Sequence, residues 1–388
     1  MNRVGVSVLL VGLLAFSNSV HASPKQQWQS DSLTKSEVSI ELFERTFSEN
    51  KQAYASIEER MKLYRVPGVS IATVSKGKLA WLKSYGVKQT GSPDKIDVDT
   101  VFSVGSISKV VTATVTLLLV QQGKLNLDAD INEYVSNWQV PTVEGLKSNS
   151  VSLRQLMSHT AGFNVHGFRD FQPSEALPNT LDILLGRAPA KNQPVKVIYK
   201  PGVAFSYSGG GTTVQQLVIE QVTGKPFVQV ARQLLFGSLN MSRSTFVNPL
   251  PASHLNIAKA HDRYGNATAL PRGWESMPEK AASGLWTSAN DLAKLMLMFI
   301  SAFNANDGAL IGEDLIQDMM SAEPNSRYGL GPAIADPVFY HSGANDSYRA
   351  LFQGNLKTGN GFIILTNSAS GEHFIEQVKK VMLTLGVG

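Results

Sequence analysis

Three serine residues in this chain are each followed, three positions later, by a lysine, a spacing that could support nucleophilic catalysis. On a helix, residues three apart lie on one face, so the ammonium group can lie beside the serine hydroxyl. A lysine that loses its proton through burial can then act as a base toward that hydroxyl. The three pairs are Ser32 and Lys35, Ser75 and Lys78, and Ser106 and Lys109.

The surroundings of the three pairs favour Ser106 as the nucleophile. Ser32 lies in a polar stretch near the N-terminus, and Ser75 lies at a Lys-Gly turn between two β-rich runs, where helical geometry is absent. Ser106 precedes an apolar segment, 107–122, that is predicted to be a buried helix because it ends at a glycine and is apolar on nearly every side. Its first N–H groups and its dipole would stabilise a developing oxyanion. The competing interpretation is a helix cap at Ser106, with Lys109 facing solvent.

A tyrosine in a loop that ends in three glycines provides a second element of a candidate site. Tyr207 lies in the segment 201–211, just before a predicted helix that begins near Thr212. Together with Ser106 and Lys109, it resembles the serine β-lactamase and penicillin-binding-protein superfamily, most closely its class C β-lactamase and D-alanyl-D-alanine carboxypeptidase branch. That family shows Ser-x-x-Lys, then Tyr-x-Asn, then Lys-Thr-Gly or a variant that contains histidine.

The third element of this pattern has two candidates. Lys357-Thr358-Gly359 matches the common letters, whereas His341-Ser342-Gly343 matches the histidine variant. The first stands in a stretch rich in glycine and asparagine between two β runs, which is typical of a hairpin tip. His341 ends a predicted strand and precedes a loop, where a strand edge could pair with an extended substrate. We therefore favour the histidine variant.

The resemblance implies a role for each matched residue. Ser106 would attack a carbonyl carbon and form an acyl-enzyme, while Lys109 and Tyr207 would handle its proton, and either of these two could be the base. Substrate contacts would come from His341, Ser342 and Gly343, and the oxyanion hole from the backbone N–H groups of Ser106 and Ala344.

The chain departs from the family pattern at two positions. Gly209 stands where the family has asparagine, and a glycine has no side chain to bind a substrate amide. His341 stands where lysine is common, so binding of a substrate carboxylate is expected to strengthen as the pH falls through about 6.5.

Strand-like runs lie at both ends of the chain, with a mainly helical segment between them. They are predicted at 69–75, 78–85, 338–341, 348–353 and 362–366. The economical arrangement is an α+β fold with one antiparallel sheet from N- and C-terminal strands, flanked by helices, and an inserted helical block at about 107–275. The resemblance implies the same β-lactamase/transpeptidase-like fold, with a cleft where the sheet meets that block.

Composition excludes several other chemistries. The 388 residues contain no cysteine, so thiol nucleophiles, disulfides and iron–sulfur clusters are excluded. The histidines show no metal-ligand spacing, and no cofactor or metal is expected. The net charge of +4 is too small and scattered to predict nucleic-acid binding. His159 ends a short predicted helix in an apolar context, where a structural hydrogen bond is a commoner role than catalysis.

The N-terminus is typical of an export signal. Arg3 precedes the apolar run Val6–Phe16, and Val20 and Ala22 are small residues before a predicted cut. The apolar run has about 11 residues, whereas a membrane span needs about 20. We therefore predict a signal peptide at 1–22, a polar segment at 23–36 and one serine hydrolase domain at 37–388. The mature protein is expected in the periplasm or outside the cell, without a stable membrane anchor.

Three functional hypotheses follow from these motifs. The leading one is an exported serine hydrolase that acts on β-lactam or D-Ala-D-Ala-type amides, including peptidoglycan stem peptides. The alternative is an esterase on the same scaffold, because Gly209 and His341 provide less anchoring for an amide. The third is a binding protein without catalytic activity, which the intact Ser106, Lys109 and Tyr207 disfavour.

Overall fold

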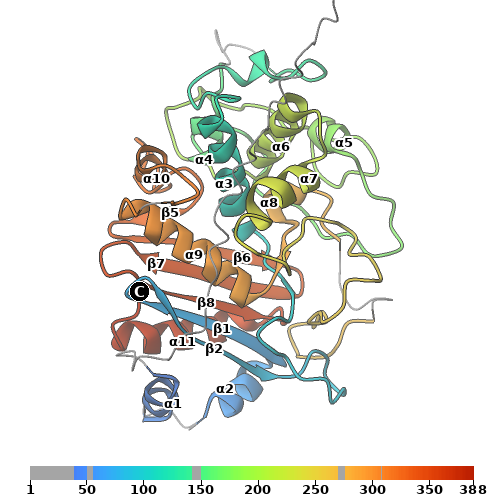
Figure 1. Ribbon diagram of the computed structural model, residues 1–388. Coiled ribbons are helices and arrows are strands. Elements are labelled where there is room, and N and C mark those ends of the chain that lie inside the picture. Colours follow the sequence, from blue (N-terminus) through green and yellow to red (C-terminus); the bar gives the residue numbers. More distant parts are fainter. Residues whose placement is uncertain (1–38, 50–55, 142–149, 270–275, 307) are drawn as a thin grey trace, which may run out of the picture. The chain divides into compact units, whose positions relative to one another are not determined.

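Figure 1 shows the computed structural model of the protein, which describes residues 39–49, 56–141, 150–269, 276–306 and 308–388. All of them fall in one compact unit, 35–388. The predicted signal peptide at 1–22, the polar segment at 23–36 and the Ser32 pair lie outside the described residues. The predicted domain boundaries therefore stay a prediction. Within the described ranges, no helix is both long enough and apolar enough to cross a membrane.

A six-stranded antiparallel sheet, built from both ends of the described chain, forms the centre of the fold (Figure 1). β1 (Gly68–Ser75) and β2 (Lys78–Gly86) form the predicted hairpin, and β1 pairs on its other side with β8 (Asn360–Thr366). The order continues through β7 (Tyr348–Asn355) and β6 (Val338–Asn345) to β5 (Ala333–Ala335). The expected α+β architecture, with one sheet from N- and C-terminal strands, is confirmed.

Both faces of this sheet are buried by helices. On one face, α1 (Ile40–Glu49), α2 (Ile57–Tyr64) and α11 (Gly371–Thr384) form a core with alternate residues of β1 and β8. The other residues of these two strands point into a second core, because successive side chains of a strand face opposite sides of a sheet. On that side, α9 (Ala289–Phe303) packs along β1 and β8. Nearly every residue of these two strands is therefore buried.

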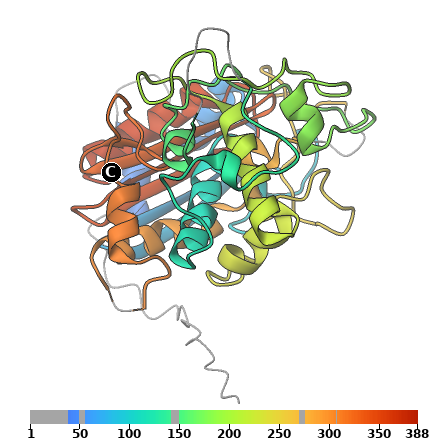
Figure 2. The same ribbon diagram turned by 90° about the horizontal axis from the view of Figure 1, so that it is seen from above.

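The middle of the chain forms a mainly helical region beside the sheet, and its helices appear in teal, green and yellow in Figure 2. Its elements are α3 (Ile107–Gln121), η1 (Ile131–Glu133), α4 (Leu153–Met157), α5 (Thr180–Leu185), α6 (Gly209–Thr223), α7 (Phe227–Ala231) and the π-helical turn η2 (Arg232–Phe236). After it come α8 (Lys280–Ser283) and α10 (Glu313–Met319). β3 (Phe102–Ser103), just before α3, pairs with β4 (Trp286–Thr287), which follows α8. Residues 107–119 of α3 are all buried, as predicted for this helix.

β6 differs from its prediction at the functionally important end. The sequence places the end of this strand at His341, because serine and glycine follow it. In the structure β6 continues to Asn345, and its residues pair with β7 throughout, from Val338 opposite Asn355 to Asn345 opposite Tyr348. The ladder with β7 overrides the weak strand preference of Ser-Gly. His341 therefore lies within a strand and not at its end.

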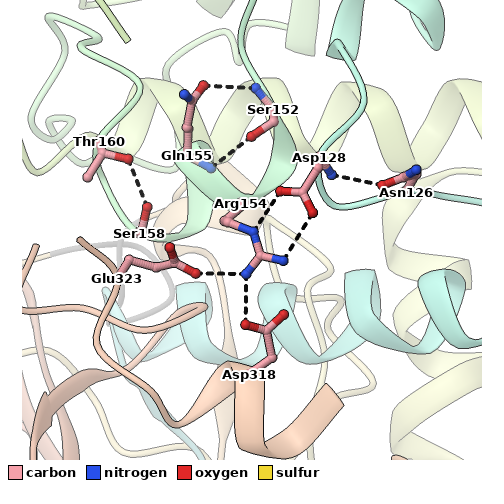
Figure 3. Close-up of polar contacts among 9 residues, drawn as sticks. All are labelled: Asn126, Asp128, Ser152, Arg154, Gln155, Ser158, Thr160, Asp318 and Glu323. Atoms are coloured by element: carbon pink, nitrogen blue, oxygen red, sulfur yellow. Dashed lines mark hydrogen bonds and ion pairs between the residues drawn. The ribbon is translucent and has the colours of Figure 1, made fainter. Parts of the chain in front are cut away.

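Arg154 on α4 joins three acidic residues from separate parts of the chain (Figure 3). Its guanidinium donates to Asp128 at 2.7 and 3.1 Å, to Asp318 at 2.7 Å and to Glu323 at 2.8 Å. The hydrogen bonds to Asp128 and Asp318 are the main reasons that the pKa of Arg154 is raised above its usual value. The network ties α4 to α10 and to the segment before β5.

Replacing Arg154 is expected to destabilise the protein. Arg154→Met leaves Asp318 and Glu323 without their shared cation, so the free energy of unfolding should fall by about 1–3 kcal/mol, measured by urea denaturation. The control is Arg45→Met, which removes an exposed pair with Glu49 and should change stability little. An equal effect of the two substitutions would contradict a structural role for the network.

Candidate active site

The start of α3 brings Ser106 and Lys109 together. Lys109 Nζ lies 3.1 Å from Ser106 Oγ and donates to the carbonyl oxygen of Ala282 at 2.8 Å. The Ser106 side chain makes no capping hydrogen bond to the helix, and Lys109 is only 4% exposed. The alternative interpretation, a helix cap with a solvent-facing lysine, is therefore wrong for this pair.

α8 supplies the carbonyl groups that hold the polar beginning of α3. Besides Ala282 and Lys109, the Thr112 hydroxyl donates to the carbonyl oxygen of Ala281 at 2.9 Å. The hydroxyl of Ser108 accepts from the N–H of Leu285, just after α8, at 2.9 Å. Buried polar groups need such partners. An otherwise apolar helix can therefore carry polar side chains at its first turns.

Burial separates the acid–base properties of Lys109 and Tyr207. Burial lowers the pKa of Lys109 to about 7, so a large fraction of its amine is neutral near neutral pH. Burial raises the pKa of Tyr207, and the hydrogen bond with Ser106 only partly opposes this shift. The phenol thus keeps its proton where the amine has lost it. Of the two candidates for the base, these environments favour Lys109.

Tyr207 lies just before α6, in a cluster of aromatic and histidine rings. Its ring centroid is 5.0 Å from Lys109 Nζ, 4.3 Å from the ring of His159 and 4.9 Å from that of His166. The ring of His341 on β6 lies 6.1 Å away. Segments far apart in the sequence therefore bring these side chains together around the ring of Tyr207.

A cavity of about 530 Å³ connects the candidate residues from the sequence. Its lining includes Ser106, Lys109, Tyr207, His341, Ser342 and Ala344. Gly343 is not part of the lining, and a Cβ atom there would collide with the carbonyl oxygen of Val104. The glycine therefore allows β6 to pass closely beside the start of α3.

A second glycine, Gly105, allows the backbones of the two residues expected to form the oxyanion hole, Ser106 and Ala344, to approach each other. Gly105, which precedes Ser106, has a φ of +48°. A Cβ atom on it would lie 2.6 Å from both the backbone nitrogen and the carbonyl oxygen of Ala344. Only glycine permits this approach, and it brings the backbones of Ser106 and Ala344 to the same side of the cavity.

The second Ser-x-x-Lys motif, Ser75 and Lys78, and the Lys357-Thr358-Gly359 motif lie away from the cavity, at one end of the sheet. Ser75 and Lys78 pair across the β1–β2 hairpin, and Lys357-Thr358-Gly359 forms the turn between β7 and β8. The N–H of Gly77 donates to the carbonyl of Gly359 at 2.8 Å, so the two turns touch. None of these residues lines the cavity that contains Ser106.

Gly209 packs against the loop that contains His166 and Phe168. Its N–H donates to the carbonyl of His166 at 2.9 Å, and a Cβ atom would lie 3.0 Å from the ring of Phe168. A side chain at this position would therefore require Phe168 to move. Where the resemblance predicts an asparagine amide, the cavity has an aromatic ring and a backbone carbonyl.

His341 is neutral over the physiological pH range. Burial, together with the nearby Lys109, lowers its pKa to about 4. Its Nδ1 lies 2.6 Å from the carbonyl oxygen of Ser342, which can only accept, so Nδ1 carries the proton and Nε2 presents a lone pair. The expectation that this residue gains charge as the pH falls through about 6.5 is therefore wrong, because the sequence does not reveal its burial.

Several lining residues were not predicted from the sequence. They are His166, Phe168, Phe205, Met277, Arg327, Tyr328 and Asn345. Most of them lie in irregular segments, whose positions depend on packing between distant parts of the chain. Only Asn345 carried a signal, because it lies on the same face of β6 as His341, at even spacing.

The family model described as Beta-lactamase matches residues 55–384, which include every candidate residue of the cavity. The chain belongs to the β-lactamase family. The prediction of a serine hydrolase of the β-lactamase and penicillin-binding-protein type is thus confirmed at the level of the family.

Individual relatives of this β-lactamase-family chain are distant. It is 23% identical over 320 residues to "Protein flp" of Staphylococcus aureus (strain N315), covering 80% of this chain and 61% of that protein. It is 28% identical over 239 residues to a "Beta-lactamase" of Pseudomonas fluorescens, covering 61% of each. The chain thus spans about three fifths of these relatives. The structure of a D-alanine carboxypeptidase AmpC from Burkholderia cenocepacia has a TM-score of 0.65 at 20% identity, covering 88% of this chain and 99% of that one.

Burial of Lys109 should make the stability of the protein depend on pH. The folded-state pKa of about 7 lies below the ordinary 10.5, so the unfolded chain binds the extra proton between these values and stability rises with pH. Lys109→Met should therefore raise the free energy of unfolding by about 1–4 kcal/mol below pH 7. The gain should shrink toward pH 10, as measured by urea denaturation at both pH values.

Lys124→Met is the matched control, because Lys124 is an exposed lysine beyond the end of α3. It should change stability little at either pH. A gain for Lys109→Met that is equal in acid and base would contradict the burial of a neutral amine.

Proposed function

We propose that this chain is an exported serine hydrolase that forms an acyl-enzyme through Ser106. The observation that carries this proposal is the contact of 3.1 Å between Ser106 Oγ and the buried Lys109 Nζ, at the wall of the cavity. The lowered pKa of Lys109 supplies a base near neutral pH. Membership of the β-lactamase family supports the same reaction class.

The proposed reaction proceeds in two acyl-transfer steps. Ser106 Oγ attacks the substrate carbonyl carbon, and its proton passes to neutral Lys109. The N–H groups of Ser106 and Ala344 stabilise the oxyanion of the tetrahedral intermediate. The leaving amine or alkoxide takes a proton from Lys109 by way of the Tyr207 hydroxyl. Water then attacks the acyl-enzyme carbonyl and gives a proton to neutral Lys109, and this proton passes to Ser106 Oγ as the bond to the acyl group breaks and the acid is released.

β-Lactam and D-Ala-D-Ala-type amides are the leading substrate class. Relatives of the chain are named for β-lactamase and for D-alanine carboxypeptidase. The hydroxyl of Ser342 and the ring of His341 line the cavity, where they can contact the substrate. Export to the periplasm or outside the cell would bring the enzyme to peptidoglycan stem peptides.

An esterase on the same scaffold is the second candidate, and two observations favour it. The ring of Phe168 lies beside Gly209, so this wall has no side-chain amide to anchor an acylamino group. His341 is neutral and offers a lone pair at Nε2, whereas a lysine would offer a charge to a carboxylate. Esters need fewer anchors because their leaving group departs more easily. A role as a non-catalytic binding protein has the least support.

A substrate panel tests the proposed function. The protein is assayed with a fluorescent penicillin, a chromogenic cephalosporin and a short-chain aryl ester. Stable labelling indicates a penicillin-binding protein, rapid cephalosporin turnover indicates a β-lactamase, and ester turnover alone indicates an esterase. Ser106→Ala should lower each activity by about 10³-fold or more, because the covalent step is lost.

Ser75→Ala is the matched control, because Ser75 belongs to a second Ser-x-x-Lys motif that lies outside the cavity. It should retain full activity. If Ser106→Ala stayed as active as Ser75→Ala, the assignment of the nucleophile would be wrong.

The neutral state of His341 predicts that this residue adds nothing to the pH dependence of substrate binding. Between about pH 5.5 and 7.5 its ring carries almost no charge, because its pKa lies near 4, whereas Lys109 titrates within this range with a pKa of about 7. The ratio of KM values for an anionic and an uncharged ester with the same acyl group should therefore vary with pH to the same extent in the wild type and in His341→Asn. A several-fold fall of this ratio on acidification through pH 6.5 that occurs in the wild type and not in His341→Asn would show that His341 is charged when substrate binds.

A further inference from the structure

His159 lies in a tight turn after α4 and is buried beneath the cavity residues. Its side chain is 3% exposed, and its φ of +60° lies in the left-handed region that side chains other than glycine seldom adopt. Strained positions of this kind persist where the surrounding structure fixes them, often at functional sites. From the sequence, a structural hydrogen bond was the only role expected for this histidine.

His159 accepts two hydrogen bonds, one from each residue that flanks Tyr207. The N–H of Ser206, immediately before the tyrosine, donates to the carbonyl oxygen of His159 at 2.7 Å. The N–H of Ser208, immediately after it, donates to His159 Nδ1 at 3.2 Å. One residue thus holds the backbone on both sides of the tyrosine.

The ring of His159 also supports the tyrosine ring. The two centroids are 4.3 Å apart with an interplanar angle of 37°, and the Tyr328 ring lies edge-on to His159 at 4.9 Å. Since Nδ1 accepts a hydrogen bond, the proton of the neutral ring is on Nε2, which has no hydrogen-bond partner among the described residues. Burial, with the positive charge of Lys109 nearby, keeps the pKa of His159 well below its usual value.

We propose that His159 is a positioning residue that fixes the hydroxyl of Tyr207 relative to Ser106, through its hydrogen bonds to Ser206 and Ser208 and its ring contact. This inference rests on the proposed function, because it gives Tyr207 a part in proton transfer. His159 does not itself reach the substrate: it is absent from the lining of the cavity. A displacement of about 1 Å at a catalytic group can lower the rate by about 10²-fold.

A double-mutant cycle between His159 and Tyr207 tests the proposal. His159→Gly accepts the left-handed backbone without strain. It removes the ring and the Nδ1 acceptor for Ser208, and it keeps the backbone carbonyl that accepts from Ser206. It should lower kcat by about 10²-fold while changing KM much less. Tyr207→Phe should also lower kcat. The double variant should be no slower than Tyr207→Phe alone, because His159 acts only through the tyrosine.

His159→Asn is the conservative variant. Asparagine tolerates left-handed backbone and offers a side-chain oxygen near the place of Nδ1, so it should recover much of the lost kcat. His159→Gln places its acceptor one bond further out and should recover less; it replaces the glycine variant in the cycle if that variant does not fold. Thr160→Val is the matched control, because it removes the Ser158–Thr160 side-chain hydrogen bond of the same turn and keeps the backbone carbonyl of Thr160, which accepts from Gly202 in the loop of Tyr207. It should keep wild-type kcat.

The outcomes separate this inference from the proposed function. Losses that multiply in the double variant, with turnover by the wild type still dependent on Ser106, would overturn the role of His159 alone. Equal kcat losses for His159→Gly, His159→Asn and Thr160→Val, matched by equal losses of thermal stability, would also overturn it, since they indicate a purely structural turn. Turnover that persists in Ser106→Ala would contradict the proposed function itself.

Discussion

The site depends on the burial of a lysine that has no carboxylate partner among the described residues. Desolvation is the cause of the lowered pKa of Lys109, and its amine makes hydrogen bonds to two neutral oxygens of the described residues, those of Ser106 and Ala282. A nearby carboxylate would stabilise the charged form and remove the base. The packing of α3 against α8 therefore sets the chemistry, because it excludes water and supplies a carbonyl that accepts a hydrogen bond without adding negative charge.

The sheet contributes to the site because β6 passes close to the residues just before α3. Glycines at 105 and 343 remove the two Cβ atoms that would keep these backbones apart. Residues 341–344 of β6 are paired with β7 but extend beyond β5, whose partners on β6 are 338–340. The same strand thus provides cavity-lining side chains, a backbone N–H beside Ser106, and an edge along which an extended substrate could lie. The proposed mechanism uses all three.

Much of the fold and the site could be predicted from the sequence, where the signal was local. A buried helix after Ser106, the β1–β2 hairpin and the choice of His341 over Lys357 all follow from patterns within short windows. The end of β6 was missed because its ladder with β7, and not the preference of Ser-Gly, decides it. The charge state of His341 and the enclosure of Gly209 by Phe168 depend on burial by residues far away in the chain, which a single sequence does not report.

β1 and β8 pair in the interior of the sheet, although these strands lie near opposite ends of the described chain. Contacts between residues so far apart in sequence form late and slow the folding of a domain. During synthesis, the first hairpin must wait with an unpaired, apolar edge until nearly the whole chain has been made. A chain cut before β6 lacks half of the sheet as well as His341 and Ala344. The nascent protein therefore lacks a complete candidate active site until its last three strands have been synthesised.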